Sequence, residues 1–215
     1  MDVHQLKTKA LSWASSVLYE RRLDVRTSGR VDLDELGLEG DDRLYYEPAE
    51  WRVLARIFKR REIGPDDVFI DYGAGMGRVL LLAARYGPRR VIGVELAPEL
   101  TEIARENVER NKDRLRCKDI EVLAADALKY EMPEDVTIVF FNNPFTGSIF
   151  AGVMDKVVES LDAAPRRLRI AYRNPIEHEA VMATGRFQLV RSWEGQAWRG
   201  PRGVKINLYE TTDQR

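Results

Sequence analysis

Residues 68–78, with the sequence VFIDYGAGMGR, decide the fold class of this 215-residue chain. The apolar residues 68–70 predict a short buried strand, and the pattern from 79 to 86 predicts a helix. Between them stand Gly73, Gly75 and Gly77, which let the backbone turn sharply and approach a ligand closely. A strand, a glycine loop and a helix in this order are typical of sheets that bind ligands beyond the carboxyl ends of their strands.

The alternation of strand and helix continues toward the C-terminus. Its pattern predicts strands at 91–94, 120–124, 136–141 and 168–172, and helices at 98–111, 147–161 and 175–184. Two further strands, 187–193 and 204–209, are predicted to form a terminal pair. We therefore predict an α/β fold with a Rossmann-like, mostly parallel seven-stranded sheet, helices on both faces and an antiparallel last strand pair.

The part of the chain before the sheet has a different pattern. Helices are predicted at 5–23 and 51–58, with a charged, glycine-dotted loop at 24–42. We expect residues 1–62 to form an N-terminal helical cap or lid and residues 63–215 to form the main domain. Tyr45, Tyr46 and Trp51 are the aromatic candidates for closing a pocket against water or touching a substrate.

Composition narrows the classes of partner. The 34 Lys and Arg residues nearly balance the 35 Asp and Glu residues, so we do not expect a nucleic-acid partner. One cysteine and two distant histidines predict neither a disulfide nor a metal site. There is no signal peptide pattern and no apolar run near the roughly 18 residues of a membrane span, so we expect a cytoplasmic protein without a membrane partner. The oligomeric state stays open.

Three acidic residues follow three successive predicted strands. Asp71 stands two residues before the first glycine, where it would repel a pyrophosphate and attract an ammonium group. Glu95 closes the second strand and could accept hydrogen bonds from two ribose hydroxyls. Asp126 follows the third strand, where it could accept from an adenine amino group while the Ala127 N–H reaches a ring nitrogen. Asp71 and Asp126 could instead cap the helices or turns that follow them.

Polar residues also follow the fourth and fifth predicted strands. Asn142, Asn143, Pro144 and Phe145 stand at the carboxyl edge, where an amide, a free carbonyl and an aromatic face could hold a substrate. Arg173 ends the fifth strand as a further candidate for substrate contact. His178 comes shortly after it and has a suitable ordinary pKa for a general base, although a lone histidine on such a helix is often a surface residue.

Taken together, these motifs resemble class I S-adenosylmethionine-dependent methyltransferases. The resemblance implies S-adenosylmethionine as cofactor and S-adenosylhomocysteine as product, with residues 63–215 as the cofactor-binding methyltransferase domain. In that family the glycine loop holds the methionine part, the acid after the second strand the ribose, and the Asp after the third strand the adenine. The implied cofactor contacts are Asp71, Gly73, Ala74, Gly75, Gly77, Glu95, Leu96, Asp126, Ala127 and Asn142.

The segment Asn142-Asn143-Pro144-Phe145 is similar to the N-P-P-Y/F motif of amino-group methyltransferases, in which the Asn side chain and a following carbonyl hold the target nitrogen. Asn142, Pro144 and Phe145 match that motif, and Asn143 replaces its first proline. The segment is also similar to the N-P-F turn of uncharacterised bacterial methyltransferases. The resemblance therefore makes Asn142, Asn143, Pro144 and Phe145 the catalytic candidates, with His178 as the candidate base.

Four functions are consistent with these residues. Our main expectation is methyl transfer to an N or O atom of a small molecule or peptide. The alternative within the same chemistry is a protein or RNA methyltransferase. An NAD-dependent oxidoreductase is less consistent, because the third glycine of a dinucleotide motif is replaced by Arg78 and Asp71 would face the pyrophosphate. A catalytically inactive protein that binds S-adenosylmethionine would keep the same loop and acids.

Overall fold

The computed structural model describes residues 17–31, 42, 46–59, 61–196 and 203–212. Within the first predicted helix, residues 17–23 are helical. Its earlier part, most of the loop at 24–42 and the predicted lid residue Tyr45 lie outside the described residues.

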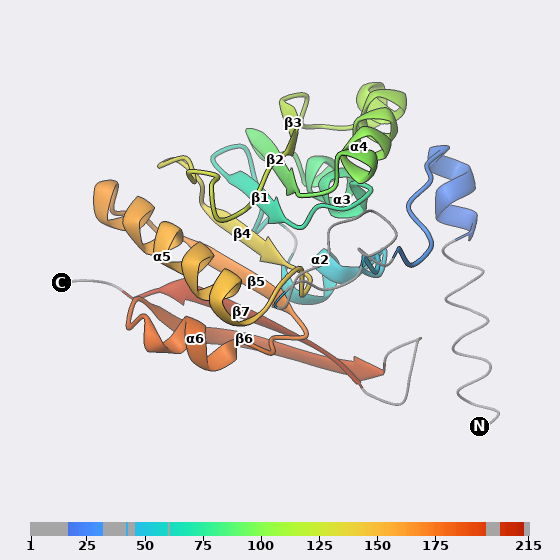
Figure 1. Ribbon diagram of the computed structural model, residues 1–215. Coiled ribbons are helices and arrows are strands. Elements are labelled where there is room, and N and C mark those ends of the chain that lie inside the picture. The colour runs from blue at the N-terminus through green and yellow to red at the C-terminus, as the bar shows by residue number, and fades with distance from the viewer. Residues whose placement is uncertain (1–16, 32–41, 43–45, 60, 197–202, 213–215) are drawn as a thin grey trace.

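In the described part of the chain, one sheet of seven strands forms the centre (Figure 1). Its strands are β1 (Val68–Tyr72), β2 (Arg90–Glu95), β3 (Ile120–Ala124), β4 (Ile138–Phe141), β5 (Arg169–Arg173), β6 (Phe187–Gln196) and β7 (Gly203–Thr211), in the order β3-β2-β1-β4-β5-β7-β6. Strands β1 to β5 are parallel, and β7 runs antiparallel to both β5 and β6. The predicted Rossmann-like fold, including the antiparallel terminal pair, is confirmed.

Helices cover both faces of the sheet, and each face has its own hydrophobic core. Helices α2 (Val53–Ile57), α3 (Arg78–Tyr86) and α4 (Pro98–Asn111) pack on one face, and α5 (Gly147–Ala163) and α6 (His178–Ala183) on the other. A short 3-10 helix, η2 (Lys112–Arg114), follows α4. Neighbouring residues of one strand enter different cores, as Phe69 and Ile70 do, because side chains alternate across a sheet. Since both faces are covered, β4 is apolar throughout and β1 is apolar except for Asp71.

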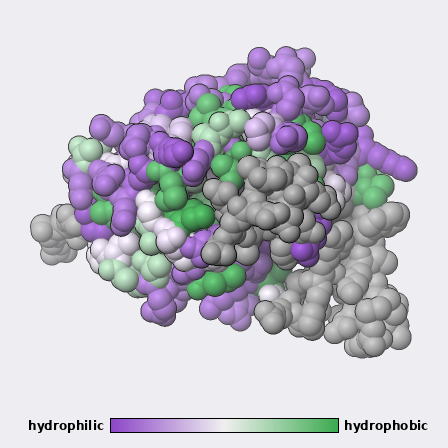
Figure 2. Space-filling view, viewed as in Figure 1, coloured by the Kyte–Doolittle hydropathy of each residue, from purple (hydrophilic) through white to green (hydrophobic). Residues whose placement is uncertain are grey.

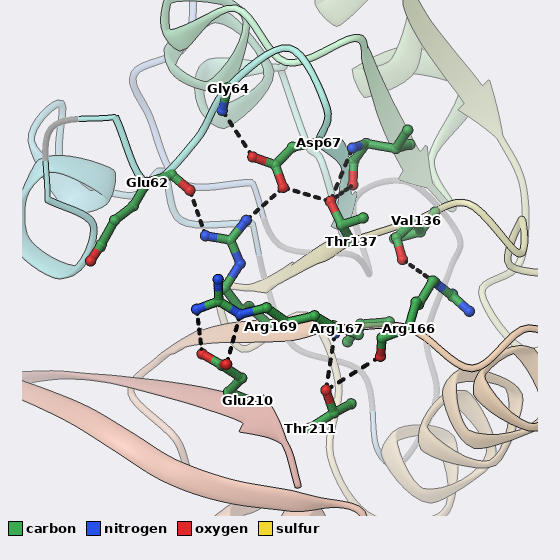
Figure 3. A network of polar contacts seen from close by, with 12 residues as sticks. Glu62, Gly64, Asp67, Val136, Thr137, Arg166, Arg167, Arg169, Glu210 and Thr211 are labelled. Carbon is green, nitrogen blue, oxygen red and sulfur yellow. Dashed lines mark hydrogen bonds and ion pairs between the residues drawn. The ribbon is translucent and has the colours of Figure 1, made fainter. Parts of the chain in front are cut away.

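A polar network ties together the amino ends of three strands (Figure 3). The Asp67 carboxylate, just before β1, accepts hydrogen bonds from Arg169 Nη2 of β5 at 2.6 Å and from Thr137 Oγ1, just before β4, at 2.8 Å. Arg167 forms a bidentate pair with Glu210 of β7. These bonds lie at the amino edge of the sheet, opposite the carboxyl edge at which such folds bind ligands.

The described part of the N-terminal segment packs against the same sheet. Leu23, Trp51 and Leu54 belong to the core that also contains Phe69 and Phe140 of the sheet. Tyr46 forms an isolated antiparallel bridge with Val31, which the sequence pattern did not indicate. The segment is therefore joined to the main domain by an apolar core, while the division at residue 62 stays a prediction.

Charged and polar residues dominate the surface in the view of Figure 2, and hydrophobic residues form small patches between them. None of the helices among the described residues is long and apolar enough to cross a membrane.

Candidate active site

A pocket lies at the carboxyl edge of the sheet, where β1 and β4 are neighbours and the strand order reverses. Ligands in open α/β sheets bind at such a switch point. The pocket is lined by Tyr46, Glu47, Gly73, Val94, Glu95, Leu96, Leu100, Ala125, Asp126, Ala127, Asn142, Asn143, Pro144, Phe145 and Ile149. Ten of the predicted site residues are therefore brought together here, from four strand ends and the N-terminal segment.

The glycine loop between β1 and α3 forms one wall of the pocket. Gly73 has a φ of 77°, and a Cβ there would come within 2.3 Å of Pro144 Cβ. Gly75 has a φ of 53°, and a Cβ there would come within 2.1 Å of the Tyr46 ring. Glycine is therefore favoured at both positions for two reasons: the backbone is in the left-handed region, and a side chain would clash with its neighbours. Ala74 and Gly77 belong to the same loop, behind the lining residues.

Two buried carboxylates stand behind this loop. Asp71 is only 2% exposed, and its Oδ1 has no hydrogen-bond partner among the described residues. Burial, with the nearby Glu95 charge adding to it, raises the pKa of Asp71 well above its ordinary value. A cationic ligand group would supply the missing partner, so the ammonium of a methionine moiety fits here.

Glu95 lines the pocket and also holds the loop in shape. Its Oε2 accepts a hydrogen bond from Gly75 N at 2.7 Å, and its Oε1 accepts one from Ala97 N at 3.0 Å. Burial raises the pKa of this carboxyl despite these bonds. Each carboxylate oxygen can accept a further hydrogen bond, so the arrangement leaves room for two ribose hydroxyls.

The far end of the pocket combines apolar walls with Asp126. Its Oδ1 accepts a hydrogen bond from Leu128 N at 3.0 Å, so the carboxylate caps the turn that follows β3, as one of the two readings of the sequence predicted. Asp126 and Ala127 nevertheless both line the pocket, between the apolar side chains of Leu96, Leu100 and Ile149. A flat, mostly apolar base with a polar edge fits this end.

The turn after β4 forms the opposite wall. Asn142 is held on both sides: its Oδ1 accepts a hydrogen bond from Arg173 Nη1 at 2.9 Å, and its Nδ2 donates one to the Glu47 carbonyl at 2.8 Å. Asn143 has a φ of 49°, and its Oδ1 is buried without a partner among the described residues. The side-chain oxygen of this turn that is free to accept a hydrogen bond therefore belongs to Asn143.

Of the predicted catalytic and substrate residues that the structure describes, three lie outside the pocket lining. His178, in α6, is bonded through Nδ1 to the Tyr209 hydroxyl at 2.8 Å, so the structure does not bring the candidate base to the site. Trp51 is buried in the core, where it stacks on Tyr19 instead of closing the pocket. Arg173 is 7% exposed and reaches the pocket only through Asn142.

Sequence reasoning missed several residues of the pocket. Leu100 and Ile149 lie in the first turns of α4 and α5, and helix starts beyond the carboxyl edge are a signal that could have indicated them. Glu47 lines the pocket beside Asn142, and Glu50 binds Arg173 behind it. Neither glutamate belongs to a motif, so no signal in the sequence singled them out.

A comparison with known families decides what this site belongs to. Residues 42–181 match the model of the family described as histone methylation protein DOT1, a match that includes every described residue of the pocket. The chain belongs to the DOT1 family. The predicted resemblance to class I S-adenosylmethionine-dependent methyltransferases is thereby confirmed at the level of family and fold.

Curated relatives of this DOT1-family protein match only part of its length. A probable ribosomal RNA small subunit methyltransferase A from Methanosarcina barkeri is 36% identical over 86 residues, which are 40% of this chain and 28% of the relative. A ribosomal protein L11 methyltransferase from Burkholderia cenocepacia is 34% identical over 83 residues, 38% of this chain and 28% of the relative. The chain thus aligns with little more than a quarter of each relative.

Solved structures share the fold of the DOT1-family protein at low sequence identity. An RNA methyltransferase from Salinibacter ruber, in complex with S-adenosyl-L-homocysteine, has a TM-score of 0.55 and 18% identity, covering 76% of this chain and 90% of that chain. TYW2 from P. horikoshii, in complex with MeSAdo, has a TM-score of 0.53 and 18% identity, covering 71% and 60%.

These relatives correct one expectation. The near-neutral charge led us to expect no nucleic-acid partner, but the relatives include methyltransferases of ribosomal RNA and of a ribosomal protein. The expectation was wrong because net charge sums over the whole surface and does not report local patches. The relatives favour a macromolecular acceptor over the small molecule or peptide that we expected.

Proposed function

We propose that the protein transfers the methyl group of S-adenosylmethionine to a nitrogen atom of a protein side chain. The observation that carries this proposal is the match to the histone methylation family, which extends across the pocket from Tyr46 to Ile149. The relative that methylates ribosomal protein L11 supports the same class of acceptor.

In the proposal, one wall of the pocket binds the cofactor and the opposite wall binds the methyl acceptor. In the proposal, Asp71 and the glycine loop hold the methionine part, Glu95 the ribose, and Asp126 with Ala127 the adenine. When bound, the cofactor supplies an electrophilic methyl group and a neutral thioether as leaving group. The chain's own contribution is to align the acceptor with that methyl group and to exclude water.

The turn at 142–145 is the proposed acceptor wall. Asn143 offers the unpartnered oxygen that could orient an amine N–H, and Pro144 contacts the glycine loop, so the two walls stay in register. Phe145 is buried against Phe141, at a centroid distance of 6.1 Å, and gives this wall a rigid apolar side. Glu47 adds a carboxylate at the same end, which attracts a side-chain ammonium group. The amine gives up a proton to solvent before transfer, so that its lone pair forms the N–CH₃ bond as the S–CH₃ bond breaks.

An RNA nitrogen is the second candidate acceptor. It is favoured by the similarity to ribosomal RNA methyltransferase A, which involves 86 residues of this chain. The two candidates differ in the molecule that becomes labelled and share the cofactor site.

Labelling with S-[methyl-³H]adenosylmethionine distinguishes them. The purified protein is incubated with an extract of its source cells from which the gene has been deleted, and the labelled material is then treated with proteinase or ribonuclease. We expect that proteinase releases the label from the macromolecular fraction and that ribonuclease does not. Ribonuclease-sensitive label would support the second candidate, and label in neither macromolecule would contradict both.

Two glycine variants control this experiment. Gly75→Val places a side chain where the Tyr46 ring lies and where φ is 53°, so we expect no cofactor binding and no label. Gly64→Ala is the matched control, because a Cβ there has no atom within 4 Å and its φ is ordinary. Label that persists with Gly75→Val would not come from this site.

A further inference from the structure

A buried ion pair lies directly behind the acceptor wall. Arg173, the last residue of β5, is 7% exposed, and Glu50, just before α2, is 9% exposed. Their contact is bidentate: Arg173 Nε donates to Glu50 Oε2 at 3.0 Å, and Nη2 donates to Oε1 at 3.1 Å. This fork-to-fork geometry fixes the plane of the guanidinium group.

The remaining guanidinium nitrogen points to the pocket. Arg173 Nη1 donates to Asn142 Oδ1 at 2.9 Å, and Asn142 Nδ2 donates to the Glu47 carbonyl at 2.8 Å. The two bonds determine which end of the amide is oxygen and which is nitrogen. Both polar atoms of the Asn142 side chain are thus bonded. The side-chain oxygen of the next residue, Asn143, has no partner among the described residues.

The electrostatics of the pair favour a fixed geometry. Burial by itself would raise the pKa of Glu50, but the charge and hydrogen bonds of Arg173 outweigh it and hold this pKa below its ordinary value. Glu50 is thus an anion at neutral pH. A buried ion pair often stabilises a fold no more than well-packed apolar residues would. Stability therefore does not account for this pair, and its fixed geometry is the feature to explain.

We propose that Glu50 is a positioning residue for methyl transfer: by holding Arg173 it orients Asn142 and thereby the acceptor turn. This rests on the proposed function, because the turn is the wall assigned to the acceptor. It also links two walls of the pocket. Residues 46 and 47 line the pocket, and Glu50 in the same segment is bonded to the end of β5. The N-terminal segment therefore takes part in shaping the acceptor site.

The test is a comparison of Glu50→Gln in two backgrounds, using the acceptor fraction that the protein labels. In the wild-type background we expect kcat to fall about tenfold. In the Asn142→Ala background the same change should lower kcat by less than about twofold, because there is no amide left to orient. The Kd for S-adenosylhomocysteine should stay within about threefold in both. Equal losses in both backgrounds, or no loss, would overturn the proposal.

Matched variants separate positioning from folding. Glu62→Gln breaks another bidentate pair, with Arg191 at 2.8 and 2.9 Å, away from the pocket, and should leave kcat unchanged. Arg173→Lys keeps the buried charge but cannot hold Glu50 in a fork and Asn142 at once, so it should reproduce the loss seen with Glu50→Gln. An unchanged kcat for Arg173→Lys would also overturn the proposal.

A second readout does not depend on turnover. The side-chain NH₂ of Asn142, identified by NMR from its absence in Asn142→Ala, should exchange with solvent about tenfold faster in Glu50→Gln than in the wild type. Unchanged exchange would show that Glu50 does not hold Asn142. If exchange accelerates but no macromolecule is ever labelled, the positioning contact stands and the proposed function fails.

Discussion

At the scale of single residues, the site contains two buried acids, of which Glu95 also holds the glycine loop and Asp71 has an unpartnered oxygen among the described residues. Asp71 lacks a partner for one oxygen, and Glu95 beside it has a raised pKa because of burial. A buried carboxylate without a cation disfavours the folded state when it is ionised. Such unpaired groups in a pocket are typical of ligand sites, and here the ligand's ammonium would relieve the cost.

The pH dependence of stability tests this account of Asp71. Its folded pKa is raised above the unfolded value of about 3.9, so the native state binds more protons than the unfolded state between these two pKa values. The Asp71 contribution to the free energy of unfolding therefore falls as pH rises through that window. We expect Asp71→Asn to raise the free energy of unfolding at pH 7 by about 1–3 kcal/mol, measured with urea.

The same variant should weaken binding of S-adenosylhomocysteine, measured by calorimetry, because the ammonium loses its counter-charge. Asp66→Asn, an exposed acid on the turn before β1, is the control and should change neither quantity. A less stable Asp71→Asn protein that binds the ligand normally would contradict the assignment of Asp71 to the ammonium.

At the scale of elements, the start of α3 connects the glycine loop with the N-terminal segment. Arg78, the first residue of α3, is 3% exposed and donates hydrogen bonds to Thr27 Oγ1 and the Ala49 carbonyl, both at 2.9 Å. It also reaches Glu20 at 3.2 Å and lies over the Trp51 ring at 4.6 Å. A cation is unfavourable at a helix N-terminus, so these contacts must outweigh the helix dipole.

Replacement of Arg78 should therefore loosen the segment that covers the pocket. Arg78→Lys cannot reproduce the planar stack and the several directed bonds, and we expect it to lower the free energy of unfolding by about 2–4 kcal/mol. Because Tyr46 and Glu47 lie in that segment, affinity for S-adenosylhomocysteine should fall too. Urea denaturation and calorimetry measure the two effects.

Arg85→Lys is the control for this element, since Arg85 is exposed in the last turn of the same helix. It should leave stability within about 0.5 kcal/mol of the wild type. If Arg78→Lys behaved like Arg85→Lys, the contacts of Arg78 would not be what holds the segment in place.

At the scale of the whole molecule, two apolar cores and the network at the amino edge make the sheet a rigid platform. The pocket lies at its opposite edge, and three of the elements around it are a loop, a turn and the N-terminal segment. A ligand that bridges these elements stabilises the folded state by mass action.

Thermal unfolding with ligand tests this arrangement. At about 100 times Kd, S-adenosylhomocysteine should add about 2.7 kcal/mol and raise Tm by roughly 5–10 °C for a chain of this size. NAD at the same concentration should leave Tm unchanged, because Asp71 would face its pyrophosphate. A rise with NAD and none with S-adenosylhomocysteine would contradict the identity of the pocket.

Most of the fold and ten of the fifteen residues that line the pocket could be predicted from the sequence. Strand and helix periodicities identified all seven strands, and helix 98–111 and strand 120–124 were predicted with their observed ends. The glycine loop, Glu95, Asp126 and the turn at 142–145 were found because each follows a strand end. Parallel strands bring such positions to one edge, so a one-dimensional pattern was enough to collect them.

The remaining features depend on residues far apart in the chain. The bond between Glu50 and Arg173 joins positions 123 apart, and that between Asn142 and Glu47 joins positions 95 apart. No local sequence pattern indicates such contacts. The same holds for the hydrogen bond between His178 and the Tyr209 hydroxyl, which holds His178 away from the pocket. The sequence alone determined the strands, the helices and their order along the chain, because these follow from periodicity, and its motifs indicated the class of cofactor. Only the tertiary structure decided which polar atoms are satisfied and which are left for a ligand, because hydrogen-bond partners are set by packing.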